Sequence, residues 1–228
     1  MPNSMSRMIP TLAALACLFT ACGGREPAPE GGTSDAAAAP VPIILVVGTS
    51  ITAGLGLDPS EAYPAVLQAM VDSAGLRYRV VNRGVSGETS AGAVQRIDWL
   101  LRQPVAVLVL ETGANDGLRG LTPDSLRANL EAIVQRARRK EPPPAILLLG
   151  MEAPPNLGAP YTAAFRAAYR DAARDLGVPL VPFLLAGVGG VDSLNQADGI
   201  HPTAAGQRRI AETVWPALRP LLKPMPGP

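Results

Sequence analysis

The amino-acid sequence predicts a three-layer α/β/α sandwich built on a central parallel five-stranded sheet. Apolar runs such as Val105–Leu110 lack the alternation of apolar and polar residues, which is typical of strands buried on both faces. Segments with helical spacing of apolar residues stand between these runs, and this alternating order gives a parallel sheet covered by helices. Apolar residues make up 47% of the 228 residues, enough for the core of one domain.

The expected elements alternate along the chain from residue 43 to residue 222. In the segment 89–101, for example, Val94, Ile97 and Leu101 recur at helical spacing and share one face. The expected strands are Ile43–Val47, Tyr78–Val81, Val105–Leu110, Ala145–Leu149 and, most weakly, Pro179–Pro182. The expected helices are Pro59–Ala74, Thr89–Leu101, Pro123–Arg139 after Thr122, Tyr161–Leu176 and Pro202–Leu222, the last with a bend at Pro216.

The first 22 residues have the features of an export signal. Arg7 precedes the apolar run Met8–Ala21, which is shorter than the about 20 residues of a membrane span. Small residues then lead to Cys22, and this arrangement resembles the lipobox of bacterial lipoproteins, in which the cysteine is lipidated. Phe19 departs from the aliphatic residue usual three places before that cysteine. We expect a membrane-anchored lipoprotein of the periplasm or cell envelope, with plain secretion or an uncleaved anchor as alternatives.

The segments flanking the domain are rich in Gly, Ala and Pro. Residues 23–42 lack periodicity and are expected to form a flexible linker, and residues 223–228 form a Pro-rich tail. The formal net charge is only +1, and no basic stripe with interleaved aromatic residues suggests a nucleic-acid partner. We expect a monomer.

Cysteine and histidine usage limits the chemistry of the domain. Its two cysteines, Cys17 and Cys22, both lie in the export segment, which leaves the domain without a disulfide framework or a thiolate metal site. The one histidine, His201, precludes a cluster of imidazole ligands and must carry any imidazole chemistry by itself.

Polar and glycine residues gather where the expected strands end. Sites in parallel sheets form at the carboxyl ends of the strands, which selects the loops Gly48–Leu57, Asn82–Ser90 and Glu111–Gly120. The sequence Asp198-Gly-Ile-His201 precedes the last expected helix. We therefore expect the functional residues in these four segments.

Ser50, Asp198 and His201 form a candidate catalytic triad. Ser50 follows the first strand near a helix N-terminus, where backbone N–H groups can face a developing oxyanion. A serine nucleophile needs a base, and Asp198 lies close enough in sequence to His201 to fix its tautomer. Taken singly, each residue also has a purely structural interpretation: Ser50 as a helix cap, Asp198 as a turn residue and His201 as a structural histidine. No G-x-S-x-G motif surrounds Ser50, which disfavours the α/β-hydrolase fold.

Four sequence blocks resemble the SGNH (GDSL-type) hydrolases, in particular the bacterial thioesterase I, lysophospholipase and arylesterase group. The blocks are VVGTSITAGLGL (46–57), VVNRGVSGETS (80–90), LETGANDGLRG (110–120) and DGIHP (198–202). The resemblance implies a flavodoxin-like sandwich with Ser50, Asp198 and His201 as the triad. It also implies an oxyanion hole formed by Ser50, Gly87 and Asn115.

The resemblance further implies a substrate-binding loop and a reaction. The segment 154–165 resembles a loop beside the acyl site, with Pro155, Asn156 and Leu157 as candidate substrate-binding residues. The implied reaction is hydrolysis of a carboxylic ester or thioester through an acyl-enzyme, without a metal or other cofactor. Thr49 stands where the family usually has Asp, and it can share a hydrogen bond but carries no charge.

Three other functions are compatible with parts of the pattern. Relatives of this fold remove acetyl groups from glycans, although the apolar, Pro-rich 154–165 loop lacks an aromatic sugar platform. A non-catalytic surface binding protein is favoured only by Thr49. A flavodoxin-like nucleotide binder would share the α/β order, but no G-x-x-x-x-G-K-[ST] phosphate loop is present.

Overall fold

The computed structural model describes residues 41–223 of the chain. The predicted signal segment with Cys22, the linker as far as residue 40 and the tail from residue 224 lie outside the described residues. Within 41–223, no helix combines the length and the hydropathy that crossing a membrane would require.

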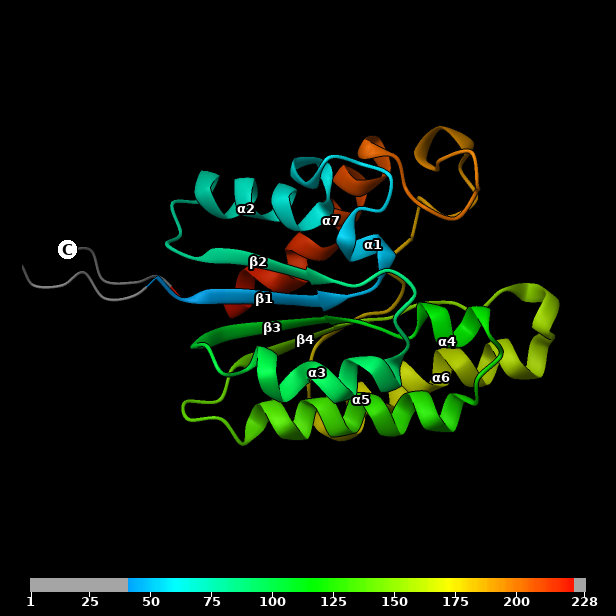
Figure 1. Cartoon of the computed structure of the whole chain (residues 1–228), viewed down its shortest axis with the longest axis horizontal. Coiled ribbons are helices and arrows are strands. Elements are labelled where there is room, and N and C mark those ends of the chain that lie inside the picture. The colour runs from blue at the N-terminus through cyan, green and yellow to red at the C-terminus, as the bar shows by residue number, and fades with distance from the viewer. Residues whose placement is uncertain (1–40, 224–228) are drawn as a thin grey trace, which may run out of the picture. The chain divides into compact units, whose positions relative to one another are not determined.

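The sheet has five parallel strands, as the sequence predicts (Figure 1). Their order in the sheet is β2-β1-β3-β4-β5. This order is the flavodoxin-like arrangement of doubly wound sheets. The strands are β1 (Ile43–Gly48), β2 (Arg79–Gly84), β3 (Val105–Glu111), β4 (Ala145–Leu149) and β5 (Leu180–Val181). Every residue of β1 is buried, because this strand lies between two neighbours and beneath helices on both faces.

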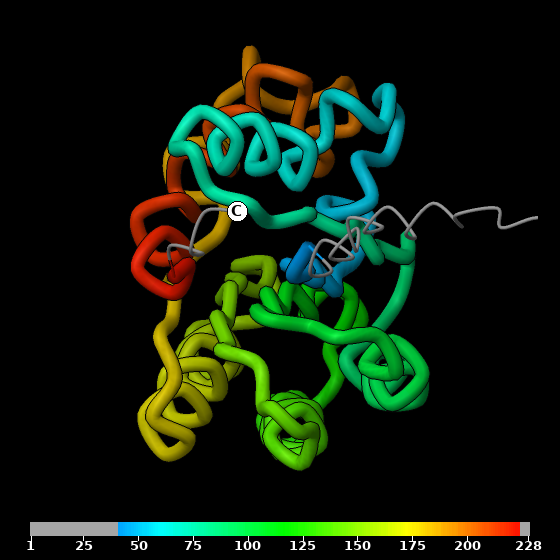
Figure 2. The backbone as a smooth tube through the Cα atoms, turned by 90° about the vertical axis from the view of Figure 1, so that its left-hand side faces the viewer, coloured from blue at the N-terminus to red at the C-terminus, as the bar shows by residue number. Residues whose placement is uncertain are grey.

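Helices cover both faces of the sheet and complete the three layers. The short helix α1 (Ser50–Ala53) lies on one face with α2 (Tyr63–Ser73) and α7 (Ala204–Leu218) (Figure 1). The other face carries α3 (Ser90–Leu100), α4 (Ala114–Leu118), α5 (Pro123–Arg138) and α6 (Ala159–Leu176). A view turned by 90° shows the sheet between these two layers (Figure 2).

The predicted boundaries differ from the structure at several ends. The expected helix 59–74 is a single 3-10 turn, Pro59–Glu61, followed by α2, because Ala62 is extended between them. The last helix begins at Ala204 rather than at residue 202, since Thr203 caps it and Pro202 forms an isolated bridge with Asn195. It continues through Pro216 and becomes a 3-10 turn at Arg219–Leu221.

Two short helices were not predicted from the sequence. Helices α1 and α4 directly follow the ends of β1 and β3, and each is too short to show a periodic apolar pattern. Both lie at the carboxyl edge of the sheet, where the candidate functional residues are.

Candidate active site

A cleft of about 580 Å³ opens at the carboxyl ends of the central strands. We call it the Ser50 cleft. Its lining is mostly apolar, with the polar side chains of Ser50, Asn115 and His201 converging in it. Its walls are Ser50, Ile51, Leu55, Ser86, Gly87, Ala114, Asn115, Leu118, Met151, Glu152, Ala153, Pro154, Pro155, Leu185, Gly189, Asn195, Gly199, Ile200 and His201.

Ser50 begins helix α1, where the buried strand β1 ends. Gly48, the last residue of β1, allows the close approach of α1 and β3. A Cβ atom there would lie 2.0 Å from the Thr52 hydroxyl oxygen and 2.5 Å from Glu111 Oε2. Residue 48 therefore has no room for a side chain, and the backbone there leads from β1 to Ser50 at the cleft.

The three residues of the candidate triad form a hydrogen-bonded relay. The Oγ atom of Ser50 lies 3.0 Å from His201 Nε2, and His201 Nδ1 lies 2.6 Å from Asp198 Oδ2. The Ser50–His201 contact joins residues 151 positions apart in the chain, one after β1 and the other before α7. The geometry fits a serine whose proton can pass to an imidazole oriented by a carboxylate.

Asp198 is held as a carboxylate by its own turn. Its Oδ1 atom accepts hydrogen bonds from the backbone N–H groups of Ile200 and His201, at 2.9 Å and 3.0 Å. The hydrogen bond with the His201 ring, followed by these two N–H groups, lowers the pKa of Asp198 well below its usual range. The carboxylate therefore stays charged beside the imidazole.

Three N–H donors of the predicted oxyanion hole border the cleft. Gly87 has a φ of +78°, a left-handed backbone conformation that favours glycine. In the described part of the chain, the backbone N–H groups of Ser50 and Gly87 donate to no protein acceptor. The Asn115 amide donates one hydrogen to the carbonyl of Glu88 at 2.9 Å, which leaves its second N–H for a ligand in the cleft.

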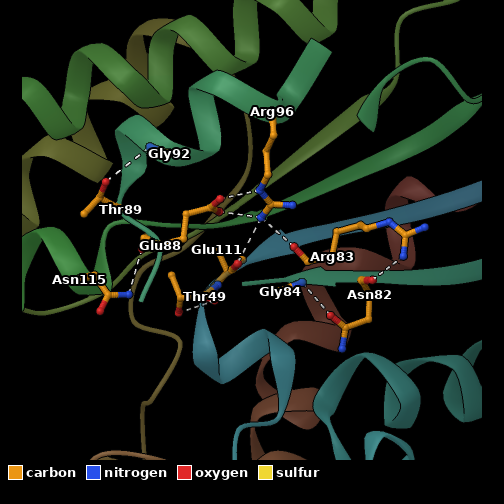
Figure 3. A network of polar contacts seen from close by, with 11 residues as sticks. Thr49, Asn82, Arg83, Gly84, Glu88, Thr89, Gly92, Arg96, Glu111 and Asn115 are labelled. Atoms are coloured by element: carbon orange, nitrogen blue, oxygen red, sulfur yellow. Dashed lines mark hydrogen bonds and ion pairs between the residues drawn. The ribbon is translucent and has the colours of Figure 1, made fainter. Parts of the chain in front are cut away.

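An ion pair that the sequence reasoning missed supports the Gly87 loop. Glu88 receives two hydrogen bonds from Arg96, each 2.6 Å long, and its side chain is only 7% exposed (Figure 3). Arg96 also donates to the carbonyl of Arg83 at 2.8 Å, at the end of β2. The pair thereby connects helix α3, strand β2 and the loop that carries Gly87. Glu88 and Arg96 are eight residues apart in the sequence, with Glu88 outside the expected helix, so no periodic pattern of a helix or strand predicted this contact.

A second missed residue, Glu111, lies directly behind the nucleophile. It ends β3, is fully buried, and accepts hydrogen bonds from the Thr49 N–H at 2.7 Å and the Thr52 hydroxyl at 2.8 Å. The Thr49 hydroxyl donates to it as well, at 2.9 Å. Burial raises the pKa of Glu111 to about 7 against the effect of these hydrogen bonds. The one signal for Glu111 in the sequence was a carboxylate closing an apolar strand.

These contacts explain what Thr49 does in place of the usual Asp. Its side chain is fully buried, and its hydroxyl donates to the Glu111 carboxylate (Figure 3). The negative charge beside the nucleophile loop is supplied by Glu111, while Thr49 supplies a neutral donor.

The residues predicted for substrate binding form a 3-10 turn, Pro155–Leu157, at the cleft border. Pro155 and the preceding Pro154 line the cleft. Asn156 is exposed outside the lining, and Leu157 packs against the core instead. Met151, Leu185 and Ile200, which were not predicted, supply apolar walls.

The described residues, 41–223, contain no group of three or more His, Cys, Asp or Glu side chains arranged to hold a metal ion. Besides Ser50, Asn115 and His201, the polar side chains that line the cleft are Ser86, Glu152 and Asn195.

Comparison with known proteins agrees with this geometry. A family profile described as the GDSL-like Lipase/Acylhydrolase family matches residues 46–209. Esterase TesA of Pseudomonas aeruginosa is 49% identical over 180 residues, which cover 78% of this chain and 89% of that protein. The Escherichia coli K12 protein named thioesterase 1/protease 1/lysophospholipase L1 is 37% identical over 187 residues, covering 81% and 87%.

A solved structure gives the same result in three dimensions. The crystal structure of TesA superposes with a TM-score of 0.76 at 49% identity, over 79% of this chain and 99% of that one. The profile spans the end of β1, the loops that carry Gly87 and Asn115 and the start of α7, so it includes every element of the Ser50 cleft. The chain therefore belongs to the GDSL-like lipase/acylhydrolase family and is a carboxylic ester hydrolase.

Proposed function

We propose that the chain hydrolyses carboxylic esters or thioesters through a covalent acyl-enzyme on Ser50. The observation that carries the proposal is the relay from Ser50 Oγ through His201 to Asp198 inside a cleft lined mostly by apolar side chains. The names of the two relatives, an esterase and a thioesterase/lysophospholipase, support the same class of reaction.

In the acylation step, His201 Nε2 takes the Ser50 proton while Ser50 Oγ attacks the acyl carbonyl carbon. The oxyanion of the tetrahedral intermediate is stabilised by the N–H groups of Ser50 and Gly87 and by the Asn115 amide. One such donor contributes about 3 kcal/mol to transition-state stabilisation. The protonated imidazole, held by Asp198, gives its proton to the leaving alcohol or thiol, and the tetrahedral centre collapses to the acyl-enzyme.

In the deacylation step, His201 takes a proton from water, and the resulting nucleophile attacks the acyl carbon. Ser50 leaves with the proton returned from the imidazole, and a carboxylic acid is released. The two steps together consume one water molecule for each ester or thioester bond broken.

The shape of the cleft favours an apolar acyl group. Leu118, Met151 and Leu185 line it, and the Pro154–Pro155 segment borders it. A sugar substrate would need polar or flat aromatic partners, and no Trp, Tyr or Phe belongs to the lining. We therefore favour lysophospholipids, acyl thioesters or aryl esters over the carbohydrate acetyl ester alternative.

The test is Ser50→Ala in the purified domain, assayed with p-nitrophenyl esters of increasing acyl length. We expect the variant to lose activity and fluorophosphonate labelling while its circular dichroism is unchanged. The wild-type protein should prefer medium or long acyl chains over acetate. A Ser50→Ala protein that keeps most of the activity would remove Ser50 from the role of nucleophile.

We further propose that residues 1–22 direct export, that Cys22 is lipidated, and that residues 23–42 tether the domain to a membrane of the cell envelope. The described domain supports this arrangement in one respect. Strand β1 begins at Ile43, at the end of the sheet opposite the Ser50 cleft, so the chain enters the domain away from the cleft. Mass spectrometry of the mature protein should find a lipidated N-terminal Cys22; an unmodified N-terminus elsewhere would refute the anchor.

A further inference from the structure

Side chains from several other elements form hydrogen bonds with helix α1, and the side chain that β3 contributes is the carboxylate of Glu111. Gln207 of α7 donates to the Ile51 carbonyl at 3.0 Å, and Asn82 of β2 donates to the Thr52 carbonyl at 2.7 Å. Glu111 of β3 accepts from the N–H and hydroxyl of Thr49 and from the hydroxyl of Thr52. The residues that flank Ser50 on both sides are thus bound to one buried carboxylate.

Glu111 is bound only by neutral donors. No Lys, Arg or His in the described range forms an ion pair with it. The nearby guanidinium of Arg96 is engaged by Glu88 and by the carbonyl of Gly48, the latter at 3.5 Å. A buried carboxylate without a cation is costly, and here the hydrogen bonds from Thr49 and Thr52 are what offset that cost.

The geometry of Glu111 relates it to catalysis through Ser50. Its Oε2 atom binds the Thr49 N–H, one residue before the nucleophile, and the Thr52 hydroxyl, two residues after it. Those two contacts set the direction of the first turn of α1. That turn carries both the Ser50 hydroxyl, which must meet His201 Nε2, and the Ser50 N–H, which must face the oxyanion.

We propose that Glu111 is a positioning residue, which as a carboxylate holds the first turn of α1 so that the Ser50 hydroxyl and N–H are aligned with His201 and Asn115. The inference rests on the proposed function, since it presupposes Ser50 as the nucleophile. Glu111 itself lies behind the backbone and does not line the cleft.

The surroundings of Glu111 make its role dependent on pH. Its ordinary pKa is raised by burial to about 7, so in weakly acidic solution a proton competes with the Thr49 and Thr52 donors for its oxygens. The titratable groups near it are Tyr63 on α2 and Tyr169 on α6. The pKa of each phenol is raised, first by burial and then by the Glu111 charge, and Asp116 on α4 adds to the effect on Tyr169. Both phenols stay neutral through the range in which Glu111 titrates.

The central experiment compares wild-type protein with Glu111→Gln, using a p-nitrophenyl ester from pH 5 to pH 9. At pH 8 we expect kcat to fall about tenfold with KM within twofold, because the amide supplies one acceptor and no charge. The rate of fluorophosphonate labelling of Ser50 should fall in parallel. On the acid side, the wild-type profile should contain an ionisation of Glu111 that the variant lacks.

The matched control is Glu141→Gln, which makes the same chemical change at an exposed position before β4, at the opposite edge of the sheet. It should behave as wild type. A Glu111→Gln protein that is less stable but has wild-type kcat per labelled Ser50 and an unchanged acid limb would overturn the proposal.

A second pair of variants keeps the proposal testable if Glu111→Gln does not fold. Thr49→Val removes one hydroxyl donor to Glu111 but keeps the backbone N–H, while Thr49→Ser keeps both. Losing a hydrogen bond to the charged form raises the pKa of a carboxylate. Thr49→Val should therefore lower kcat several-fold and move the acid limb to higher pH, and Thr49→Ser should restore both. An unchanged limb in Thr49→Val would contradict the proposal.

Failure of this inference differs from failure of the proposed function. An inactive wild-type protein, or an active Ser50→Ala variant, would remove the hydrolase mechanism itself. An active wild-type protein that depends on Ser50 but is indifferent to Glu111 and Thr49 would remove only the positioning role.

Discussion

The two ends of the catalytic relay are supported in different ways. Ser50 follows a fully buried strand, and its neighbours Thr49, Ile51 and Thr52 are held by residues from β3, α7 and β2. His201 and Asp198 lie on an irregular segment before α7, and the Asp198 side chain is 46% exposed. The position of the Asp198 carboxylate is set mainly by short-range hydrogen bonds, two of them from backbone N–H groups in the same turn. The core thus positions Ser50, while hydrogen bonds within a local turn orient Asp198 and His201.

A few longer contacts do anchor the acid–base segment. Gln196 donates from its backbone N–H to the His201 carbonyl at 2.7 Å and from its side chain to the Leu55 carbonyl, also at 2.7 Å. Leu55 follows helix α1, so this hydrogen bond ties the base to the nucleophile loop. The contrast predicts that perturbing the nucleophile side should cost stability and rate together, while perturbing the other side should cost mainly rate.

The largest effect is expected from His201→Gln. The chain has no second imidazole, so no other side chain can take the Ser50 proton. Removing one triad member from a serine hydrolase lowers kcat by roughly 10⁴-fold or more. The melting temperature should stay close to that of wild type, because the side chain lies at the cleft surface. A variant that retains a tenth of wild-type kcat would contradict the role of His201 as base.

Asp198→Asn comes next. The amide cannot stabilise the imidazolium that forms during catalysis, and we expect kcat to fall by roughly 10³- to 10⁴-fold, with KM little changed. The lowered pKa of Asp198 also gives a sign to its effect on stability. A carboxylate whose pKa is lower in the folded state adds stability above its unfolded pKa, and this contribution is lost as the pH falls. Wild-type protein should therefore lose more stability than Asp198→Asn on acidification below about pH 4. Parallel denaturation curves at pH 3 and pH 6 would measure this.

Asn115→Ala tests the part of the site opposite the relay. Loss of one oxyanion donor should lower kcat by roughly a hundredfold or more with KM nearly unchanged, because the donor acts on the transition state. Asn115 also donates to the Glu88 carbonyl, and Asn115→Asp keeps the size while replacing both donors with a negative charge that opposes the oxyanion, so it should lose at least as much kcat. Unchanged kcat in Asn115→Ala would exclude it from the oxyanion hole.

A matched pair of glutamines tests the comparison most directly. Gln207 is 1% exposed, accepts from the Tyr63 N–H at 2.9 Å and donates to the Ile51 carbonyl. Gln207→Ala leaves the Tyr63 N–H buried without a partner and removes one of the two hydrogen bonds to the Ile51 carbonyl, which also accepts from the Gly54 N–H, and it should cost about 2 kcal/mol of unfolding free energy. Gln196→Ala, on the half-buried acid–base segment, should lower kcat several-fold with a much smaller loss of stability. Equal stability losses would mean that the two sides are supported alike.

The last expected effect concerns stability alone and is its dependence on pH through Glu111. A carboxyl whose pKa is raised in the folded state adds stability that is present below its unfolded pKa and lost as the pH rises through its folded pKa. For Glu111 that window runs from its ordinary value of 4.5 to about 7. The wild-type free energy of unfolding should therefore decline between these values by about 3 kcal/mol relative to Glu111→Gln. Urea titrations at pH 5 and pH 8 would show whether the two proteins diverge.

Much of the site was within reach of the sequence because its polar residues follow apolar strands. Ser50, Gly87 and Asn115 come after β1, β2 and β3, and parallel strands place their carboxyl ends at one edge. His201 was selected by exclusion, as the one imidazole in the chain. The lengths of α1 and α4 were not predictable, because helices of four and five residues carry no periodic pattern.

The sequence by itself determined the order of strands and helices along the chain, the parallel class of the sheet and the residue types available for catalysis, since these depend on local patterns and composition. The tertiary structure decided which side chains surround them. Glu111 reaches Thr49 across 62 positions because β1 and β3 are neighbours in the sheet, and Arg96 of α3 reaches the Arg83 carbonyl at the end of β2 as well as Glu88. It also decided that Pro155 lines the cleft and Asn156 does not. Such contacts follow from the packing of distant segments, and no local pattern in the sequence encodes them.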